Sequence, residues 1–309
     1  MNAKNLSVCL LTYNHEHLIE KVIYSILNQT YKDYELIISD DNSSDNTYRI
    51  CSALSVKDER IKLIKTKSNL GMAGNANYAI RHAKYKYIAL LHHDDILHED
   101  AFSEWLNCIE INDRIVFVFN YYKTNAPKTK KEISIIKNFT SVIEGKYFLK
   151  KFLLKNWGCP VRGTALIRKK YFDEVGGMNE KFGMLADVDL WMRLSARWDV
   201  GYVNKPLMEV LVNRPLDYPK DYTEFSWKSL FNLFDIHASN INRNNYPNYL
   251  RYIFKRFVFR NKVSFEIIKW NIYAVVRNKK EIIYSYKNEN NCQYFYSKWL
   301  VAIVKLLFT

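Results

Sequence analysis

The chain has 309 residues, of which 48% are hydrophobic and 25% charged, a composition typical of folded proteins and not of disordered ones. This length allows one sizeable α/β core with an appendage. Its five cysteines are an odd number without C-x-x-C spacing, which argues against a disulfide framework and a zinc knuckle. A reducing compartment is therefore expected.

The net charge of +14 is concentrated near the end of the sequence. Residues 243–309 carry 13 Lys and Arg against three Glu, a difference of +10. The most apolar run, Trp299–Phe308, contains Lys305 and is shorter than the roughly 20 residues that span a bilayer. With no signal-peptide pattern at the N-terminus, we expect a cytoplasmic chain, located free or at the inner face of the cell membrane.

The first part of the sequence alternates strand and helix patterns. An apolar run over 6–12 predicts a strand buried on both faces, and apolar residues at helical spacing predict a helix from about His15. The pattern recurs, with strands at 34–39, 61–64 and 87–91 and helices from about Asp45 and near 73–84. This alternation predicts a doubly wound, mostly parallel sheet whose ligands bind beyond the carboxyl ends of its strands.

The regular alternation ends near residue 120. The following stretches predict a polar surface loop or hairpin over 123–137, a loop at 157–160, a short strand over 164–168 and a helix over 187–196. Beyond Pro219 the sequence favours helices rich in aromatic and basic residues. We therefore place a boundary near Pro215–Pro219, between a catalytic domain at 1–218 and a basic aromatic region at 219–309.

Polar residues gather where the predicted parallel strands end. They are Thr12-Tyr13-Asn14, Asp40-Asp41-Asn42 and His92-His93-Asp94-Asp95. A departing nucleoside diphosphate develops negative charge, which a divalent cation held by carboxylates can neutralise. Asp94 and Asp95 stand where such a site needs them, although capping a helix near His98 explains their spacing equally well.

Two further carboxylate positions suggest the rest of a nucleotide-sugar site. Asp41, with Thr12 and Glu16, is placed to recognise a uracil-like base, while an ordinary turn composition also accounts for residues 40–43. Transfer to a hydroxyl needs a general base, and Asp187 and Asp189 open the helix predicted over 187–196. These two carboxylates would also complement that helix's dipole, so spacing alone does not decide.

Six stretches, taken together in order and spacing, resemble the family 2 glycosyltransferases of the GT-A fold over residues 6 to about 213. They are Ser7–Glu16, Ser25–Tyr31, Tyr34–Asp45, Asn69–Asn77, Tyr87–Ile96 and Ala186–Arg193. The resemblance implies a Rossmann-like, mostly parallel sheet flanked by helices, with nucleotide binding over about 1–119, the acceptor side over about 120–218 and a C-terminal helical extension.

It also implies inverting transfer of a sugar from a nucleotide diphosphate, with a UDP-sugar favoured, to a glycan or lipid-linked acceptor. Capsule, lipopolysaccharide or another surface glycan is the expected product. Mn²⁺ or Mg²⁺ would assist the leaving group.

The same resemblance assigns roles to individual residues. Asp187 takes the place of the catalytic base, Asp41 that of the nucleobase ligand, and Asp94 and Asp95 those of the metal ligands. The full nucleotide-binding set is Thr12, Tyr13, Asn14, Glu16, Asp41, Asn69, Asn77 and Asp94, and the acceptor or support set is Trp157, Asp189 and Arg193.

The sequence departs from the family pattern at three positions. His92 replaces the leading Asp of Leu-Asp-x-Asp-Asp, Ala186 replaces a Glu, and Ala76 replaces an Arg that meets the diphosphate. Imidazole can ligate Mn²⁺, although a lone His-His pair is more often structural. Arg81 and Lys84 are candidates for the missing cation.

The basic aromatic region leaves several interpretations open. Its interleaved Lys, Arg and aromatic side chains suit an anionic membrane surface, while packing on the catalytic domain or in a homo-oligomer accounts for them as well. Nucleic-acid binding lacks a supporting motif, so no nucleic-acid partner is expected. No Gly-rich loop follows the first strand, which argues against dehydrogenases and nucleotidyltransferases. A non-catalytic or nucleic-acid-binding basic protein on the same fold remains the alternative.

Overall fold

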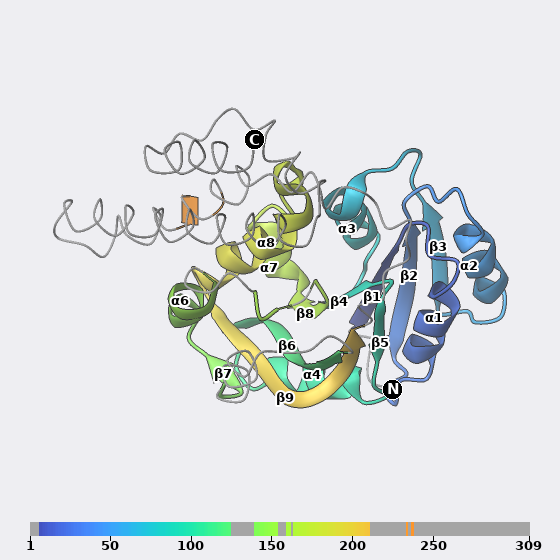
Figure 1. Ribbon diagram of the computed structural model, residues 1–309. Helices are drawn as coiled ribbons and strands as arrows, with labels where there is room; N and C mark the ends of the chain where they lie inside the picture. Colours follow the sequence, from blue (N-terminus) through green and yellow to red (C-terminus); the bar gives the residue numbers. More distant parts are fainter. Residues whose placement is uncertain are drawn as a thin grey trace, which may run out of the picture. The chain divides into compact units, whose positions relative to one another are not determined.

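The computed structural model describes residues 6–124, 139–153, 159–161, 163–210, 233 and 236–237. The strands in these ranges are β1 (Leu6–Thr12), β2 (Tyr34–Asp40), β3 (Ile61–Lys65), β4 (Tyr87–His92), β5 (Asp95–Leu97), β6 (Ile115–Thr124), β7 (Val142–Ile143), β8 (Ala165–Arg168) and β9 (Asp199–Val210). They form one sheet in the order β3-β2-β1-β4-β8-β6-β9-β5, and β7 pairs with β9 outside this path (Figure 1).

The two halves of the sheet differ in strand direction. β3, β2, β1 and β4 are all parallel, and the partners Leu6↔Tyr34 and Leu6↔Tyr87 set β1 in the middle of this half. β8 is antiparallel to both β4 and β6, while β6 and β9 run parallel. β5 and β7 are antiparallel to β9. The predicted α/β class with a mostly parallel sheet is confirmed, with a mixed second half.

Helices connect the strands and cover the sheet (Figure 1). Those in the described residues are α1 (Ile19–Leu27), α2 (Thr47–Ser55), α3 (Gly71–Arg81), α4 (Ala101–Ile109), α6 (Gly145–Phe148), α7 (Lys169–Glu174) and α8 (Ala186–Ser195), with a π-helix over Leu149–Leu153 and a 3₁₀ helix over Glu180–Leu185. Because side chains alternate along a strand, Leu6, Val8 and Leu10 share a core with α1, α2 and α4. Ser39, from the opposite face of β2, donates to Asn75 of α3.

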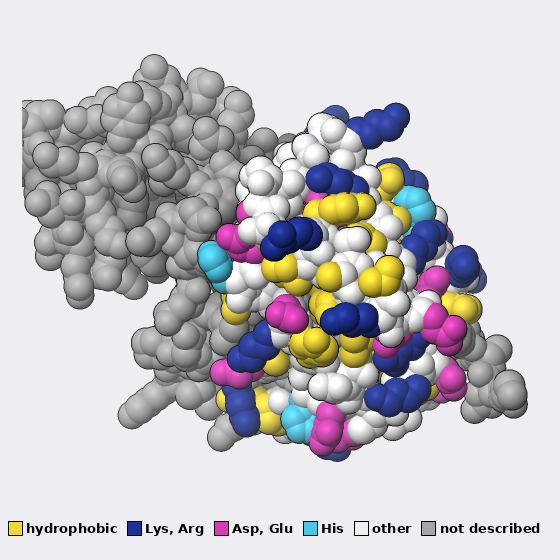
Figure 2. Space-filling view, turned by 90° about the vertical axis from the view of Figure 1, so that its right-hand side faces the viewer, with side chains coloured by type: hydrophobic (Ala, Val, Ile, Leu, Met, Phe, Trp, Pro, Cys, Tyr) yellow, Lys and Arg dark blue, Asp and Glu magenta, His cyan; other side chains and the backbone are white. Residues whose placement is uncertain are grey.

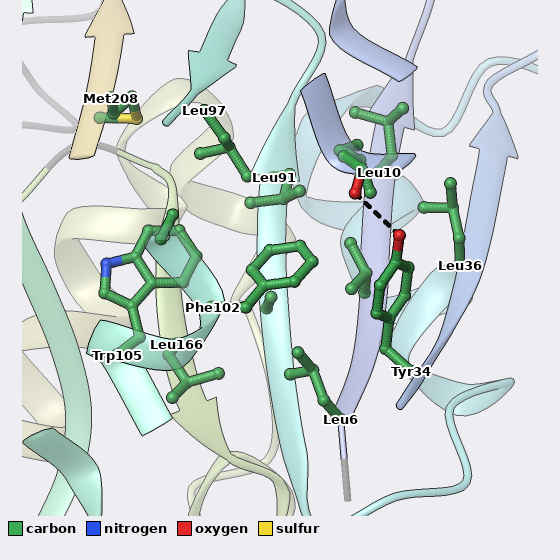
Figure 3. Packing of buried hydrophobic residues seen from close by; sticks show 14 of the residues in the cluster. Leu6, Leu10, Tyr34, Leu36, Leu91, Leu97, Phe102, Trp105, Leu166 and Met208 are labelled. Carbon is green, nitrogen blue, oxygen red and sulfur yellow. Dashed lines mark hydrogen bonds between the residues drawn. The ribbon is translucent and has the colours of Figure 1, made fainter. Parts of the chain in front are cut away.

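Aromatic side chains fill the core between the sheet and α4. Figure 3 shows Phe102 between Tyr34 of β2 and Trp105, with ring centroids 5.3 Å and 6.0 Å away. The Tyr34 hydroxyl donates to the carbonyl of Ile26 at 2.8 Å, and Trp105 Nε1 donates to Asn120 Oδ1 at 3.0 Å. Removing a buried ring of this kind costs about 3–5 kcal/mol. This core fixes the strands whose ends carry the site.

Contacts along the chain divide it into two units, Met1–Arg214 and Pro215–Thr309. Nearly all of the second unit, including the predicted basic aromatic helices, lies outside the described residues, as does most of the predicted loop at 123–137. In the part that the structure describes, no helix is both long enough and apolar enough to cross a membrane. On the face that Figure 2 shows, acidic and basic side chains are interspersed among hydrophobic ones.

Candidate active site

The carboxyl ends of the parallel strands bring several loops to one edge of the sheet (Figure 1). The loop after β1 and the loop after β2 are joined by side chains. Asn14 N donates to Ser43 Oγ at 3.0 Å, and Asn14 Oδ1 accepts from Ser44 N at 2.9 Å. Glu16 Oε2 accepts from the backbone and side-chain nitrogens of Asn46. Asn14 and Glu16 therefore shape the edge where a nucleotide is predicted to bind.

Asparagine suits the two sharp bends in these loops. Asn14 and Asn42 have φ angles of 51° and 63°, in the left-handed region that Asn tolerates better than most residues. Tyr13, next to the first bend, is half-buried, and its carbonyl lies 2.9 Å from His15 Nδ1. One bend thus lies in the loop after β1 and the other in the loop after β2.

Asp41 lies at the junction of three loops. Its backbone N–H donates to the carbonyl of Thr12 at 2.9 Å. Its Oδ1 accepts from Thr66 Oγ1 at 3.0 Å and from Leu70 N at 2.9 Å. Burial raises the pKa of this carboxyl, and the hydrogen bonds to Leu70, Thr66 and Gly71 oppose the rise. The Asp41 carboxyl is thus desolvated and held by hydrogen bonds, and its contact with a nucleobase stays a prediction.

Thr12 ends β1 beside this junction. It is the register partner of Asp40 in β2, and both side chains are buried. Thr12 Oγ1 and Asp40 Oδ1 have no hydrogen-bond partner among the described residues. Asp40 Oδ2 accepts from Ser43 N at 3.0 Å, so this carboxylate supports the loop that carries Asp41.

Asn69 and Asn77 flank and occupy α3. Asn69 Oδ1 accepts from Gly71 N at 2.9 Å, at the first turn of the helix. Asn77 exchanges two hydrogen bonds with the backbone of Met178, both 2.9 Å long. Both side chains thus stabilise the local fold around α3. Their part in nucleotide binding stays a prediction.

The turn from β4 to β5 carries the predicted metal ligands. Asp94 is half-buried in the turn, and Asp95 opens β5 with its carboxylate buried. Asp95 Oδ2 accepts from Thr164 Oγ1 at 2.5 Å. Helix α4 begins only at Ala101, after Asp100 as its N-cap residue. The alternative that Asp94 or Asp95 caps the following helix is therefore wrong.

Histidines pack tightly beside this turn. The rings of His15 and His93 are 3.4 Å apart between centroids. Burial, and after it the neighbouring His15, lower the pKa of the His93 imidazole to about 3, so His93 is neutral at physiological pH. His92 packs against Gly163, where an added Cβ would stand 2.1 Å from His92 Nε2. His92 and His93 are thus both packed against other residues of the protein.

The carboxylates of this turn suit a cation that is shared with a diphosphate. In the described ranges, no group of three or more His, Cys, Asp or Glu side chains is arranged to hold a metal ion. Mg²⁺ commonly binds through one or two carboxylates together with substrate phosphate oxygens, so it needs no such group. The oxygen donors of Asp94 and Asp95 fit a shared site of this kind.

Helix α8 carries the predicted base in its first turn. Asp187 is half-buried, and its Oδ1 accepts from Val188 N at 2.7 Å. Asp189 is buried and accepts from Arg193 Nε at 2.7 Å. Because Asp189 is buried and paired with Arg193, Asp187 is the more accessible of the two carboxylates. Both also lie where carboxylates complement a helix dipole.

Arg193 joins α8 to the turn after α7. Its Nη1 donates to the Val175 carbonyl at 2.6 Å and its Nη2 to the Gly177 carbonyl at 2.8 Å. These contacts hold α8 in place, and the supporting role of Arg193 and Asp189 in catalysis stays a prediction. Trp157, the other support residue, lies outside the described residues.

Sequence reasoning did not identify Thr66 or Thr164. The Thr66 hydroxyl donates a hydrogen bond to the Asp41 carboxylate, and the Thr164 hydroxyl donates one to the Asp95 carboxylate. Neither belongs to the motif stretches, so no pattern in one sequence singles them out.

A family model described as Glycosyl transferase family 2 matches residues 7–176, more than half of the chain. The Escherichia coli protein UDP-Glc:alpha-D-GlcNAc-diphosphoundecaprenol beta-1,3-glucosyltransferase WfgD is 36% identical over 118 residues, which are 38% of this chain and 46% of that protein. The chain spans 34%, 66% and 48% of the length of three other curated relatives that it matches.

Solved structures share the fold. Staphylococcus aureus TarS 1–349 in complex with UDP-GlcNAc aligns with a TM-score of 0.64 at 16% identity, covering 91% of this chain and 79% of that one. The mannosyltransferase PcManGT from Pyrobaculum calidifontis, in complex with GDP-Man and Mn²⁺, aligns with a TM-score of 0.59 at 15% identity, covering 99% and 80%. At these identities the likeness shows the fold alone.

Proposed function

The chain belongs to glycosyl transferase family 2, and from this premise we propose that it transfers a sugar from a nucleotide diphosphate donor to an acceptor hydroxyl with inversion. The observation that carries the proposal is the edge of the sheet where Asp41, Asp94 and Asp95 follow parallel strands β2 and β4. Ligands of such sheets bind at this edge.

A UDP-sugar is the favoured donor. Asp41 recognises the nucleobase, and the loops after β1 and β2 line the nucleotide pocket with Thr12, Tyr13 and Asn14. TarS, which shares the fold, has been solved with UDP-GlcNAc, and this supports a uridine nucleotide. The buried, hydrogen-bonded carboxylate of Asp41 is an acceptor that a uracil N–H can meet.

Asp94 and Asp95 are the residues that would hold Mn²⁺ or Mg²⁺ beside the donor's diphosphate. PcManGT, whose structure contains GDP-Man and Mn²⁺, supports this assignment through the shared fold. When bound, the cation neutralises the charge that develops on the departing diphosphate. The chain's own contribution is to hold two carboxylates in one turn, with Asp95 fixed by Thr164.

Asp187 acts as the general base. It takes the proton of the acceptor hydroxyl as that oxygen attacks the anomeric carbon from the face opposite the diphosphate, while the bond from that carbon to the diphosphate oxygen breaks and the nucleoside diphosphate leaves. Asp189 supports this step by its ion pair with Arg193, which ties α8 to the carbonyls of Val175 and Gly177. The half-buried position of Asp187 leaves it accessible to an acceptor.

The acceptor is a glycan or lipid-linked sugar in surface-glycan biosynthesis, such as capsule or lipopolysaccharide. The Escherichia coli relative, by its name, uses a diphosphoundecaprenol-linked GlcNAc as acceptor, and this supports a lipid-linked substrate. A basic aromatic region at 219–309 would suit an acceptor presented at an anionic membrane.

Incubation of the purified chain with single donors tests the proposal. UDP-glucose, UDP-N-acetylglucosamine and GDP-mannose would each be supplied with Mn²⁺ or with EDTA, with and without a polyprenyl-diphosphate-linked sugar. We expect Mn²⁺-dependent release of UDP, stimulated by the acceptor, and a product of inverted anomeric configuration by NMR. A folded chain that releases no nucleoside diphosphate from any donor would refute the proposal.

A further inference from the structure

The hydroxyl of Thr164 bonds to His92 and Asp95, the residues on either side of His93 and Asp94 in the sequence. Thr164 is buried, with 1% of its surface exposed. Its Oγ1 accepts from the backbone N–H of His92 at 3.2 Å and donates to Asp95 Oδ2 at 2.5 Å. One side chain thus restrains both ends of the turn that carries the proposed cation ligands.

The position of Thr164 follows from the pairing of β4 with β8. The last register pair of these antiparallel strands is Leu90↔Ala165. Thr164 precedes β8, so its side-chain oxygen meets the His92 N–H just beyond the end of the backbone ladder. The preceding residue, Gly163, lies under the His92 ring, because a Cβ there would stand 2.1 Å from Nε2. Two consecutive residues therefore hold His92.

The bond to Asp95 is short enough to orient its carboxylate. An O–H···O⁻ distance of 2.5–2.7 Å is typical of a charge-assisted hydrogen bond. The partners are 69 residues apart in sequence, so the turn's geometry depends on the second half of the sheet. Groups that orient a metal ligand typically change metal affinity 10- to 100-fold when they are lost.

We propose that Thr164 is a positioning residue for the divalent cation, acting through Asp95 and the His92 backbone. This inference rests on the proposed function, because it assumes that Asp94 and Asp95 share a cation with the donor's diphosphate. A hydroxyl is required at this place, since one group must donate to Asp95 and accept from His92 at once. Serine can do both, whereas valine, of the same shape, can do neither.

Binding of UDP, measured by calorimetry with and without Mn²⁺, tests the inference without relying on activity. We expect Thr164→Val to weaken UDP binding in Mn²⁺ about 10- to 100-fold and to leave metal-free UDP binding unchanged. Thr164→Ser should bind UDP and Mn²⁺ as the wild type does. Thr30→Val, at an exposed threonine, is the matched control and should change neither. If Thr164→Val does not fold, Thr164→Cys replaces it, because a thiol is a weak donor of similar size.

An Asp95→Asn background shows whether Thr164 acts through Asp95. There, Thr164→Val should have little further effect on the Mn²⁺ response, because residues acting through one another are non-additive. Equal loss of UDP affinity with and without Mn²⁺, or a Ser variant as weak as the Val variant, would make Thr164 merely structural and overturn the inference. If the wild-type chain binds UDP with the same affinity with and without Mn²⁺, the proposed metal role is overturned, and the inference with it.

Discussion

The two sides of the proposed site hold their carboxylates by different means. On the nucleotide side, Asp41 is buried among neutral donors, the Thr66 hydroxyl and the Leu70 N–H. On the base side, Asp189 is buried against the guanidinium of Arg193. A carboxylate with neutral partners tolerates an isosteric amide, whereas a buried ion pair does not tolerate the loss of one partner. The two sides should therefore respond in opposite ways to removal of charge.

The largest effect is expected at Asp187, the accessible carboxylate of the base side. Asp187→Asn should lower the transfer rate about 10²- to 10⁴-fold, the usual contribution of a general base. Donor binding should stay nearly unchanged, because the base acts on the acceptor. Initial rates with saturating donor and calorimetry with UDP measure the two quantities separately.

Asp173→Asn, at an exposed carboxylate on α7 that pairs with Lys169, is the control and should keep full activity. Near-normal turnover by the Asp187→Asn enzyme would remove Asp187 from the role of base.

Arg193→Met should destabilise the fold by about 3 kcal/mol, since it leaves Asp189 as a buried charge without its cation. The carbonyls of Val175 and Gly177 lose their donor as well. Urea unfolding followed by tryptophan fluorescence measures the change. Lys169→Met removes an exposed pair at the same i,i+4 spacing and should cost less than about 0.5 kcal/mol. Equal costs for the two variants would contradict the comparison.

Asp94→Ala and Asp95→Ala should each weaken UDP binding in Mn²⁺ about tenfold or more, the usual scale when a metal site loses a ligand or its support. The change should disappear in EDTA. Calorimetry gives both affinities, and Asp33→Ala, at an exposed loop position before β2, supplies the control. If both variants bind UDP like the wild type in Mn²⁺, these carboxylates do not hold the cation.

The smallest effect is a gain of stability in Asp41→Asn. Because burial raises the pKa of Asp41, the folded chain binds a proton more readily than the unfolded chain. The free energy of unfolding of the wild type therefore falls as pH rises from the ordinary pKa of 3.8 through the raised value. The amide variant lacks this loss, so it should have a higher Tm at pH 7 and no such advantage at pH 3.

Asp41→Asn should also bind UDP more weakly, because the carboxylate recognises the base in our proposal. Thermal unfolding at both pH values tests the stability, and a wild type more stable than the variant at pH 7 would contradict the account of Asp41.

The first half of the fold could be predicted because each strand is an apolar run followed by its own helix. β1 and β2 match their predicted ranges to within one residue, and β4 ends at His92, one residue beyond its predicted end. The helix expected from about His15 begins at Ile19, since Asn14 and Glu16 are engaged with the loop after β2. Local patterns do not report contacts between loops.

The second half depends on partners that are distant in sequence. β8 has four residues and lies between β4 and β6, so its place follows from long-range pairing and not from its own pattern. The bond from Thr164 to Asp95 and those from Arg193 to two backbone carbonyls arise in the same way. The site motifs could be listed from the sequence, but the groups that orient them could not.

The most direct test of the central claim compares UDP with uridine. If Asp94 and Asp95 hold a cation against the diphosphate, Mn²⁺ should strengthen the binding of UDP and leave uridine, which has no phosphate, unaffected. Calorimetry with each ligand, in Mn²⁺ and in EDTA, gives four affinities from one protein preparation. We expect Mn²⁺ to raise the affinity for UDP and not the affinity for uridine. In Asp94→Ala, the affinity for UDP should be the same in Mn²⁺ and in EDTA. Equal binding of UDP with and without Mn²⁺ would contradict the account.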